Sequence, residues 1–197
     1  QKIYRMTFKK QLPNLITLLN LLSGTIAVIF AVKEQLVLAA CFVFLGIFLD
    51  FFDGLAARLL KVEGELGKQL DSLADVVTSG VVPGIVLFQL LSKAFSEESW
   101  SEPGLVSINP IDWNSFDTAF LYGLPGLLVT LAAAYRLAKF NIDTRQTTSF
   151  IGLPTPANAL FFGAFPFILS ATFAVDLPVL QDLISNYWVL LGLVMLV

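Results

Sequence analysis

Four aspartates are the residues of this chain best suited to chemistry. They stand as two pairs, Asp50 with Asp53 and Asp71 with Asp75. Each pair lies at one end of a long apolar run, where an ionised carboxylate is costly unless a cation accompanies it. The sequence has no histidine and one cysteine, so a cluster here offers oxygen ligands. Oxygen ligands select hard cations, which predicts Mg²⁺ or Mn²⁺, with Ca²⁺ as a non-productive occupant.

Helical spacing places the first pair on one face of a helix. An α-helix turns by about 100° per residue, so Asp50 and Asp53 face the same side as Gly54. Ala57 and Arg58 follow one turn later on that side. The small residues leave space for a bulky ligand, and Arg58 offers a bidentate contact to a phosphate.

The second pair has a matching arrangement. Gly67, Asp71 and Asp75 are four residues apart and therefore share a face of the next helix. The segment that joins the two helices is short, so they are predicted to be antiparallel neighbours. The two acidic faces are therefore expected to meet at one depth.

The elements that carry these residues are predicted to be membrane spans. Hydrophobic residues make up 56% of the chain and charged residues 14%, which argues against a soluble enzyme. A span needs roughly 20 apolar residues. Six segments qualify, at about 13–32, 36–60, 70–92, 118–140, 152–174 and 178–197.

The predicted fold is an all-α integral membrane protein with six transmembrane helices around a cytoplasm-facing polar cavity. Residues 1–12 are expected to form an N-terminal juxtamembrane segment, and residues 13–197 the transmembrane catalytic domain. The last apolar run reaches the end of the sequence with no polar tail, so a further C-terminal part is expected to be missing.

Loop charges predict the orientation of these spans. The loops alternate sides, and one side holds only Lys33 and Lys93. The other side is predicted to be cytoplasmic, because basic residues concentrate there. Its basic residues are Lys2, Arg5, Lys9, Lys10, Arg58, Lys61, Lys68, Arg136, Lys139 and Arg145.

Three interpretations compete for the acidic cluster. A structural salt-bridge network needs about as many cations as acids, and Arg58 and Lys68 are too few. A cation transporter also uses intramembrane acids, but transporters usually place them near the midplane and often in repeated halves. The third interpretation, which we favour, is a metal enzyme acting on a phosphate-bearing lipid.

The complete string is more specific than its parts. D-F-F-D-G-L-A-A-R is followed, after eight residues, by G-K-Q-L-D-S-L-A-D. This resembles the signature of the CDP-alcohol phosphatidyltransferases, D-x2-D-G-x2-A-R, a spacer, and G-x3-D-x3-D. All eight signature positions match: Asp50, Asp53, Gly54, Ala57, Arg58, Gly67, Asp71 and Asp75.

The resemblance implies transfer of a phosphatidyl group from a CDP-linked lipid to an alcohol, with CMP as the leaving group. It implies two Mg²⁺ or Mn²⁺ ions per site, held by the four aspartates, with Asp71 and Asp75 catalytic and Asp75 as the general base. It makes Gly54, Ala57, Arg58 and Gly67 the contacts to the CDP group. A homodimer is also implied.

The first span adds polar residues on one face. Thr17, Asn20 and Gly24 lie within about 60° of one another, and Asn14 precedes them by a turn. Polar groups in a span point inward, away from lipid. Asn14 and Thr17 are candidate contacts to CDP, and structural hydrogen bonds between helices are an equal alternative.

Three further strings resemble the phosphatidylserine synthase branch of this family. They are R-L-A-K-F-N at 136–141, G-L-P-T-P-A-N-A at 152–159, and P-N-L-I-T-L-L-N-L-L-S-G at 13–24. This resemblance implies CDP-diacylglycerol and L-serine as substrates, and an enzyme of the prokaryotic cytoplasmic membrane. Glycerol 3-phosphate and inositol phosphate are the alternative acceptors.

Arg136, Lys139 and Asn141 are the predicted contacts to the acceptor or to the lipid-side phosphate. Arg136 and Lys139 are three residues apart on one face, and arginine can hold a carboxylate bidentately. Anchoring of the span by cytoplasmic charges is the alternative for both. Membrane lipids are expected partners. Nucleic acid is not, since the net charge is −3.

Overall fold

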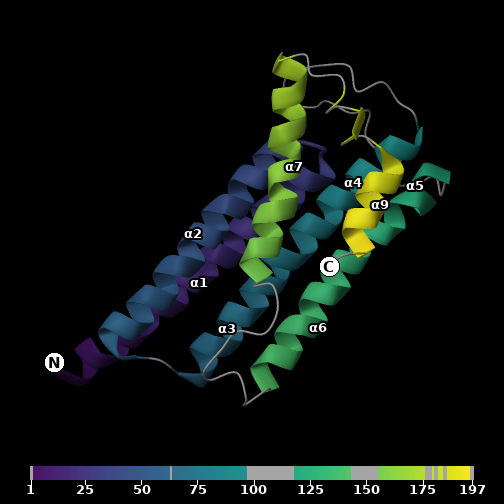
Figure 1. Cartoon of the computed structure of the whole chain (residues 1–197). Helices are drawn as coiled ribbons and strands as arrows, with labels where there is room; N and C mark the ends of the chain where they lie inside the picture. Colours follow the sequence, from purple (N-terminus) through teal and green to yellow (C-terminus); the bar gives the residue numbers. More distant parts are fainter. Residues whose placement is uncertain are drawn as a thin grey trace.

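The protein is described by a computed structural model of the whole chain (Figure 1). Every regular element in its described parts is a helix. The described residues are 2–62, 64–96, 118–142, 155–175 and 186–195, with positions 179, 182 and 183.

The first two helices form an antiparallel hairpin. Helix α1 spans Lys2–Val32 and α2 spans Leu36–Leu60, with a tight turn between them. Small buried residues line their contact, which lets the backbones approach closely, as is common between helices in a membrane. These small residues are Ala27, Ala31, Ala39, Ala40 and Gly46.

A long helix runs through the centre of the molecule. It consists of α3 (Glu65–Asp75), a π-helical turn η1 (Val76–Val81) and α4 (Val82–Ser96). The N–H of Val82 bonds the carbonyl oxygen of Val77, five residues back, as a π-turn requires. Pro83 follows directly and has no N–H to donate, which favours a local departure from α-helical bonding.

The remaining helices pack around this central helix. Helices α5 (Thr118–Gly123) and α6 (Leu128–Ile142) are joined by a 3₁₀ turn, η2 (Leu124–Leu127). Helix α7 spans Thr155–Val175 and α9 spans Tyr187–Met195. Helix α4 contacts α1, α2, α5, α6, α7 and α9.

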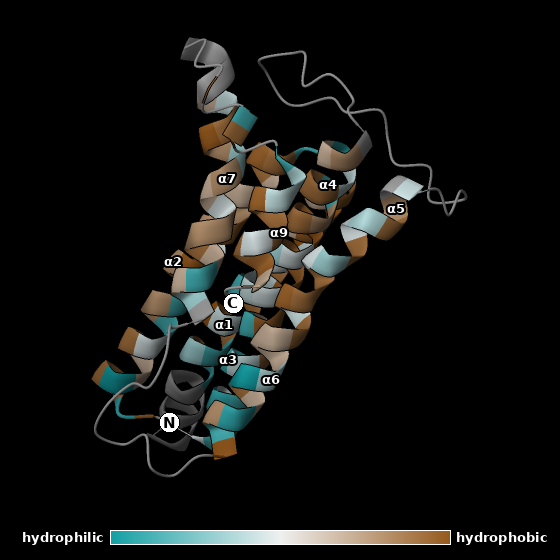
Figure 2. Ribbon diagram, turned by 45° about the vertical axis from the view of Figure 1, so that its right-hand side comes forward, coloured by the Kyte–Doolittle hydropathy of each residue, from teal (hydrophilic) through white to brown (hydrophobic). Residues whose placement is uncertain are grey.

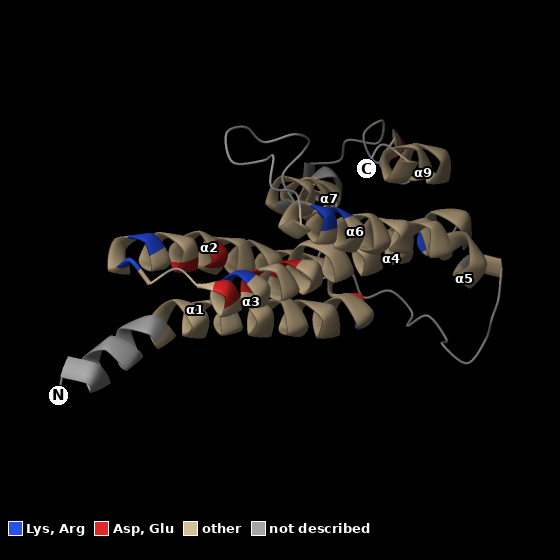
Figure 3. Ribbon diagram, turned by 90° about the horizontal axis from the view of Figure 1, so that it is seen from below, with Lys and Arg blue, Asp and Glu red and all other residues tan. Residues whose placement is uncertain are grey.

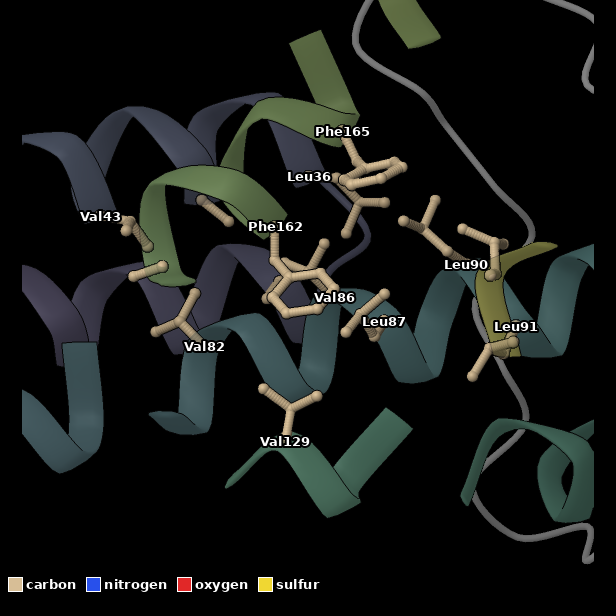
Figure 4. Packing of buried hydrophobic residues seen from close by; sticks show 14 of the residues in the cluster. Leu36, Val43, Val82, Val86, Leu87, Leu90, Leu91, Val129, Phe162 and Phe165 are labelled. Carbon is tan, nitrogen blue, oxygen red and sulfur yellow. The ribbon is translucent and has the colours of Figure 1, made fainter. Parts of the chain in front are cut away.

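The apolar core follows from this arrangement (Figure 4). Phe162 of α7 is fully buried and lies among side chains of α4 such as Val82 and Val86. Val43 of α2 and Val129 of α6 close the cluster from either side. The central helix is therefore held on several sides, which fixes the position of the acidic residues it carries.

Four of the six predicted spans are confirmed as helices long and apolar enough to cross a membrane. The third predicted span begins earlier than expected, at Glu65. In α7 the apolar stretch Pro156–Ala171 is shorter than a span, and the described part of α9 has 9 residues. The fifth and sixth spans, which extend beyond the described residues, therefore stay predictions, as do the domain bounds. The four helices are Gln11–Val32, Leu36–Leu60, Glu65–Phe95 and Phe120–Ile142.

The outer surface is that of an integral membrane protein. Large apolar side chains such as Phe48, Phe51 and Leu59 of α2 point outward and are more than half exposed. Hydrophilic residues gather at one end of the bundle, on α2, α3 and α6 (Figure 2). Helix α1 begins at Lys2 and continues through Pro13, so the predicted juxtamembrane segment is helical.

Candidate active site

A cavity of about 530 Å³ opens between α2 and α3 at the polar end of the molecule. Helix α1 packs against both helices, whereas α2 and α3 barely touch each other. The two helices were predicted to be neighbours, and they are neighbours across this space. Most predicted site residues line the cavity: Asn14, Thr17, Asp50, Asp53, Gly54, Ala57, Arg58, Gly67 and Asp71.

Three aspartates converge in this cavity. Asp50 and Asp53 come from α2, and Asp71 comes from α3 on the other side of the cavity. Figure 3 shows acidic residues on both of these helices. One carboxylate oxygen of each lies within 4.8 Å of the others. Sequence spacing predicted that these residues would face one another, and the structure confirms that three of the four do.

The donor set fits a hard divalent cation. Two oxygens on opposite sides of Mg²⁺ or Ca²⁺ are separated by about 4 to 5 Å, since each metal–oxygen distance is about 2.0–2.6 Å. The observed 4.8 Å limit falls within that range. Since no nitrogen or sulfur ligand stands in this group, it suits Mg²⁺, Mn²⁺ or Ca²⁺ better than zinc.

Asp75 takes a different place from the other three carboxylates. It is 9% exposed and does not line the cavity. Its side chain lies within hydrogen-bond reach of Asp50 and of Asn20 on α1. Asp75 therefore lies behind Asp50, and its predicted place among the metal ligands remains a prediction.

Helix α1 supplies donors to the carboxylates. The hydroxyl of Thr17 donates a short hydrogen bond to Asp53 Oδ2. The amide nitrogen of Asn20 lies 3.5 Å from Asp50 Oδ1. The structural alternative for α1 is therefore observed, since Thr17 bonds another helix. Thr17 also lines the cavity, and its contact to CDP stays a prediction.

The predicted CDP contacts lie together on the cavity wall. A methyl group at Gly54 would lie 3.9 Å from Arg58 Nη2, so the guanidinium extends over that glycine. A methyl group at Gly67 would lie 3.2 Å from Asn14 Oδ1. A side chain at Gly67 would therefore crowd Asn14, whereas a methyl group at Gly54 would make only an ordinary contact with Arg58.

The predicted acceptor contacts on α6 stand outside this cavity. Arg136, Lys139 and Asn141 do not line it. The amide nitrogen of Asn141 donates to Ser72 Oγ at 2.8 Å, which ties the end of α6 to α3 beside Asp71. Basic residues of α6 lie at the same end as the acidic residues of α3 (Figure 3).

Comparison with known proteins identifies the family. The profile of the CDP-alcohol phosphatidyltransferases matches residues 10–197. The chain belongs to the CDP-alcohol phosphatidyltransferase family. The resemblance carried by the aspartate signature is therefore confirmed, and with it the prediction of an enzyme. The cavity of this phosphatidyltransferase is lined by seven of the eight signature residues, all except Asp75.

Several relatives within the family bear more specific names. A CDP-diacylglycerol–serine O-phosphatidyltransferase of Bacillus subtilis is 33% identical over 82% of this chain and 76% of its own length. One of Helicobacter pylori is 31% identical over 75% of this chain and 54% of its own length. An archaetidylserine synthase of Methanothermobacter thermautotrophicus is 28% identical over 78% of this chain and 57% of its own length. No solved structure matches the chain.

Sequence reasoning missed Thr78 beside the site of this phosphatidyltransferase. Thr78 in the π-turn donates to Asn20 Oδ1 at 2.9 Å. Thr78 follows Asp75 by three residues, and this spacing was the one sign that it lies near the site. α-Helical spacing does not predict a π-turn, so it could not show that Thr78 faces Asn20. Lys68 and Pro156 also line the cavity and were not predicted as contacts.

Proposed function

We propose that the protein transfers the phosphatidyl group of CDP-diacylglycerol to the hydroxyl of L-serine, giving phosphatidylserine and CMP. The convergence of Asp50, Asp53 and Asp71 in a cavity lined by the family signature carries this proposal. Relatives named CDP-diacylglycerol–serine O-phosphatidyltransferase support serine as the acceptor.

In the proposed reaction the serine oxygen forms a bond to the lipid-side phosphorus of the diphosphate. The bond from that phosphorus to the bridging oxygen breaks, and CMP leaves with the bridging oxygen. The hydroxyl proton passes to Asp75. Arg58 holds a phosphate of the CDP group, and Asn14 and Thr17 border the nucleotide, since all three line the cavity.

We infer that Asp50, Asp53 and Asp71 hold two Mg²⁺ or Mn²⁺ ions, with Asp75 completing the set. When bound, such ions neutralise the diphosphate and the negative charge that develops on the leaving group. Thr17 orients the Asp53 carboxylate by its hydrogen bond. The buried position of Asp75 suits a proton acceptor shielded from water.

The same site gives the proposed orientation. Arg58, Lys61 and Lys68 stand at the end of the molecule where the cavity opens. Because basic residues concentrate on the cytoplasmic side, the cavity faces the cytoplasm in this proposal. The protein is placed in the cytoplasmic membrane of a prokaryote, as a homodimer surrounded by membrane lipids.

A CMP-release assay tests the function. The purified protein in detergent, with CDP-diacylglycerol and Mn²⁺, is given serine, glycerol 3-phosphate, inositol phosphate or no acceptor. We expect CMP release with serine alone and loss of release on chelation by EDTA, restored by Mn²⁺ or Mg²⁺. Release with a different acceptor would overturn the choice of serine, and cation flux in liposomes without CMP release would favour a transporter.

Arg136 lies on α6 outside the cavity, and α6 is joined to α3 beside Asp71 by the Asn141–Ser72 hydrogen bond; from this position Arg136 is proposed to contact the carboxylate of serine. Replacement by alanine is expected to raise the KM for serine by about 10-fold or more, because a charge-assisted hydrogen bond contributes about 1.5–3 kcal/mol. The KM for CDP-diacylglycerol should change far less. Steady-state kinetics with each substrate varied in turn measure both. Equal changes in the two KM values would remove Arg136 from the acceptor site.

A further inference from the structure

Asn20 is a polar residue buried within the apolar span of α1, and its role there needs an explanation. Its side chain is 0% exposed, so its amide must find partners within the protein. It lies within reach of Asp50 on α2 and of Asp75 on the central helix. One side chain of α1 thus lies beside carboxylates of two different helices.

The orientation of the Asn20 amide follows from its partners. Carboxylates accept hydrogen bonds and amide nitrogens donate them, so Nδ2 faces Asp50. The opposite end, Oδ1, accepts a hydrogen bond from Thr78 Oγ1 at 2.9 Å. Thr78 is 1% exposed and therefore has no water to compete for its hydroxyl. The Thr78 bond thus holds the nitrogen of Asn20 toward the carboxylates.

The π-turn and two glycines give Thr78 this position. A methyl group at Gly24 of α1 would lie 2.5 Å from Thr78 Oγ1. A methyl group at Gly46 of α2 would lie 2.6 Å from Thr78 Cγ2 and 2.9 Å from Asn20 Oδ1. These distances are shorter than those at which real Cβ atoms approach other atoms. Glycine at both positions therefore leaves room for the Asn20–Thr78 pair, and a larger residue would displace it.

We propose that Asn20 is a positioning residue of the metal site, which fixes Asp50 and Asp75 relative to each other and is itself oriented by Thr78. The proposal rests on the proposed function only in taking the carboxylates as metal ligands. Asp50 and Asp75 come from two different helices, and α1 packs both against α2 and against the part of the central helix that carries Asp75. The Asn20–Thr78 pair, with one residue on each side of that packing, links the two carboxylates through α1.

Metal affinity of the resting protein tests the proposal without requiring turnover. Mn²⁺ binding to the chelator-stripped protein is titrated by electron paramagnetic resonance. Thr78→Val removes the hydroxyl and keeps the shape, and we expect Mn²⁺ affinity to fall about 10–100-fold, as for other outer-shell partners of metal ligands. Thr78→Ser keeps the hydroxyl and is expected to bind Mn²⁺ within about 3-fold of the parent protein on the same argument.

A matched control stands on α1. Thr25 is exposed, and its hydroxyl bonds only the Leu21 carbonyl oxygen of its own helix, at 2.8 Å. Thr25→Val makes the same chemical change away from the site and should leave Mn²⁺ affinity unchanged. Parent-like Mn²⁺ binding in Thr78→Val would overturn the proposal, as would an equal loss in Thr78→Ser.

A second variant tests the same contact if the Thr78→Val protein cannot be purified. Gly46→Ala keeps every donor and acceptor but displaces the pair, so Mn²⁺ affinity should fall. Adding Thr78→Ser removes the crowded methyl and should restore part of that affinity. Gly163→Ala is the control, since its methyl would lie 3.6 Å from Phe44, an ordinary contact. Unchanged affinity in Gly46→Ala would contradict the proposal.

Two readouts separate this role from simple stabilisation and from the proposed reaction. If the pair only stabilised the fold, thermal unfolding in EDTA would change while the Mn²⁺ affinity of the folded protein would not, which would overturn the positioning role. If the parent protein binds Mn²⁺ but releases no CMP with any acceptor, the proposed function fails. The positioning role would then still be judged by the Mn²⁺ titrations.

Discussion

Replacement of Asp71 by asparagine is expected to reduce CMP release by about 10³-fold or more, since loss of an outer-shell partner alone costs about 10–100-fold. Asp71 is the one member of the convergent group that comes from α3, so it closes the site across the cavity. Asparagine keeps the size of the side chain and removes the negative charge. The decrease should appear in kcat/KM at saturating Mn²⁺.

Glu65→Gln provides the matched control for that variant. Glu65 is an exposed carboxylate on the same helix, in its first turn, and does not line the cavity. The change removes one charge from α3 without touching the site, so CMP release should stay near the parent level. Undiminished turnover in Asp71→Asn, with Asp75→Asn likewise active, would refute the metal-site assignment.

Replacement of Arg58 by alanine is expected to lower kcat/KM by about 10–100-fold. A hydrogen bond to a charged group contributes about 1.5–3 kcal/mol, and each 1.36 kcal/mol is tenfold in rate. The guanidinium extends over Gly54 on the cavity wall, where a diphosphate has access to it. Arg58→Lys should recover only part of the loss, because lysine keeps the charge but not the planar bidentate donors.

Lys61 allows the effect of charge to be separated from that of contact. It is an exposed cation at the end of the same helix, in a left-handed backbone conformation with φ 52°, and it does not line the cavity. Lys61→Ala should leave kcat/KM for CDP-diacylglycerol nearly unchanged. A loss as large as that of Arg58→Ala would show that the general positive charge of this end, and not the Arg58 contact, attracts the substrate.

Much of the site was predictable because its signals are local. The four-residue spacing of Gly67, Asp71 and Asp75 places them on one helical face, whatever the helix packs against. The absence of histidine restricts the aspartate cluster to oxygen ligands before any fold is known. The lengths of the apolar runs predicted six membrane spans, and four of these are confirmed within the described residues.

Other features depend on how the helices pack against one another. The spacing of residues within one segment does not predict that packing. The cavity lies between α2 and α3, and α1 packs against both of these helices. Asp50, Asp53 and Asp71 line the cavity, whereas Asp75 is near them but does not line it. The predicted helical faces indicated that the four carboxylates would converge. They did not indicate which of the carboxylates would lie close enough together to bind one cation.

The aspartate cluster, its oxygen-only ligands and the membrane environment were predictable, because residue type and helical period are properties of one segment. The contact between Thr78 and Asn20 was not predictable in this way. That contact needs a π-turn, in which five-residue bonding replaces the α-helical period, and two glycines on neighbouring helices that leave it space. Its partners lie 58 residues apart, so it forms only when three helices are packed together.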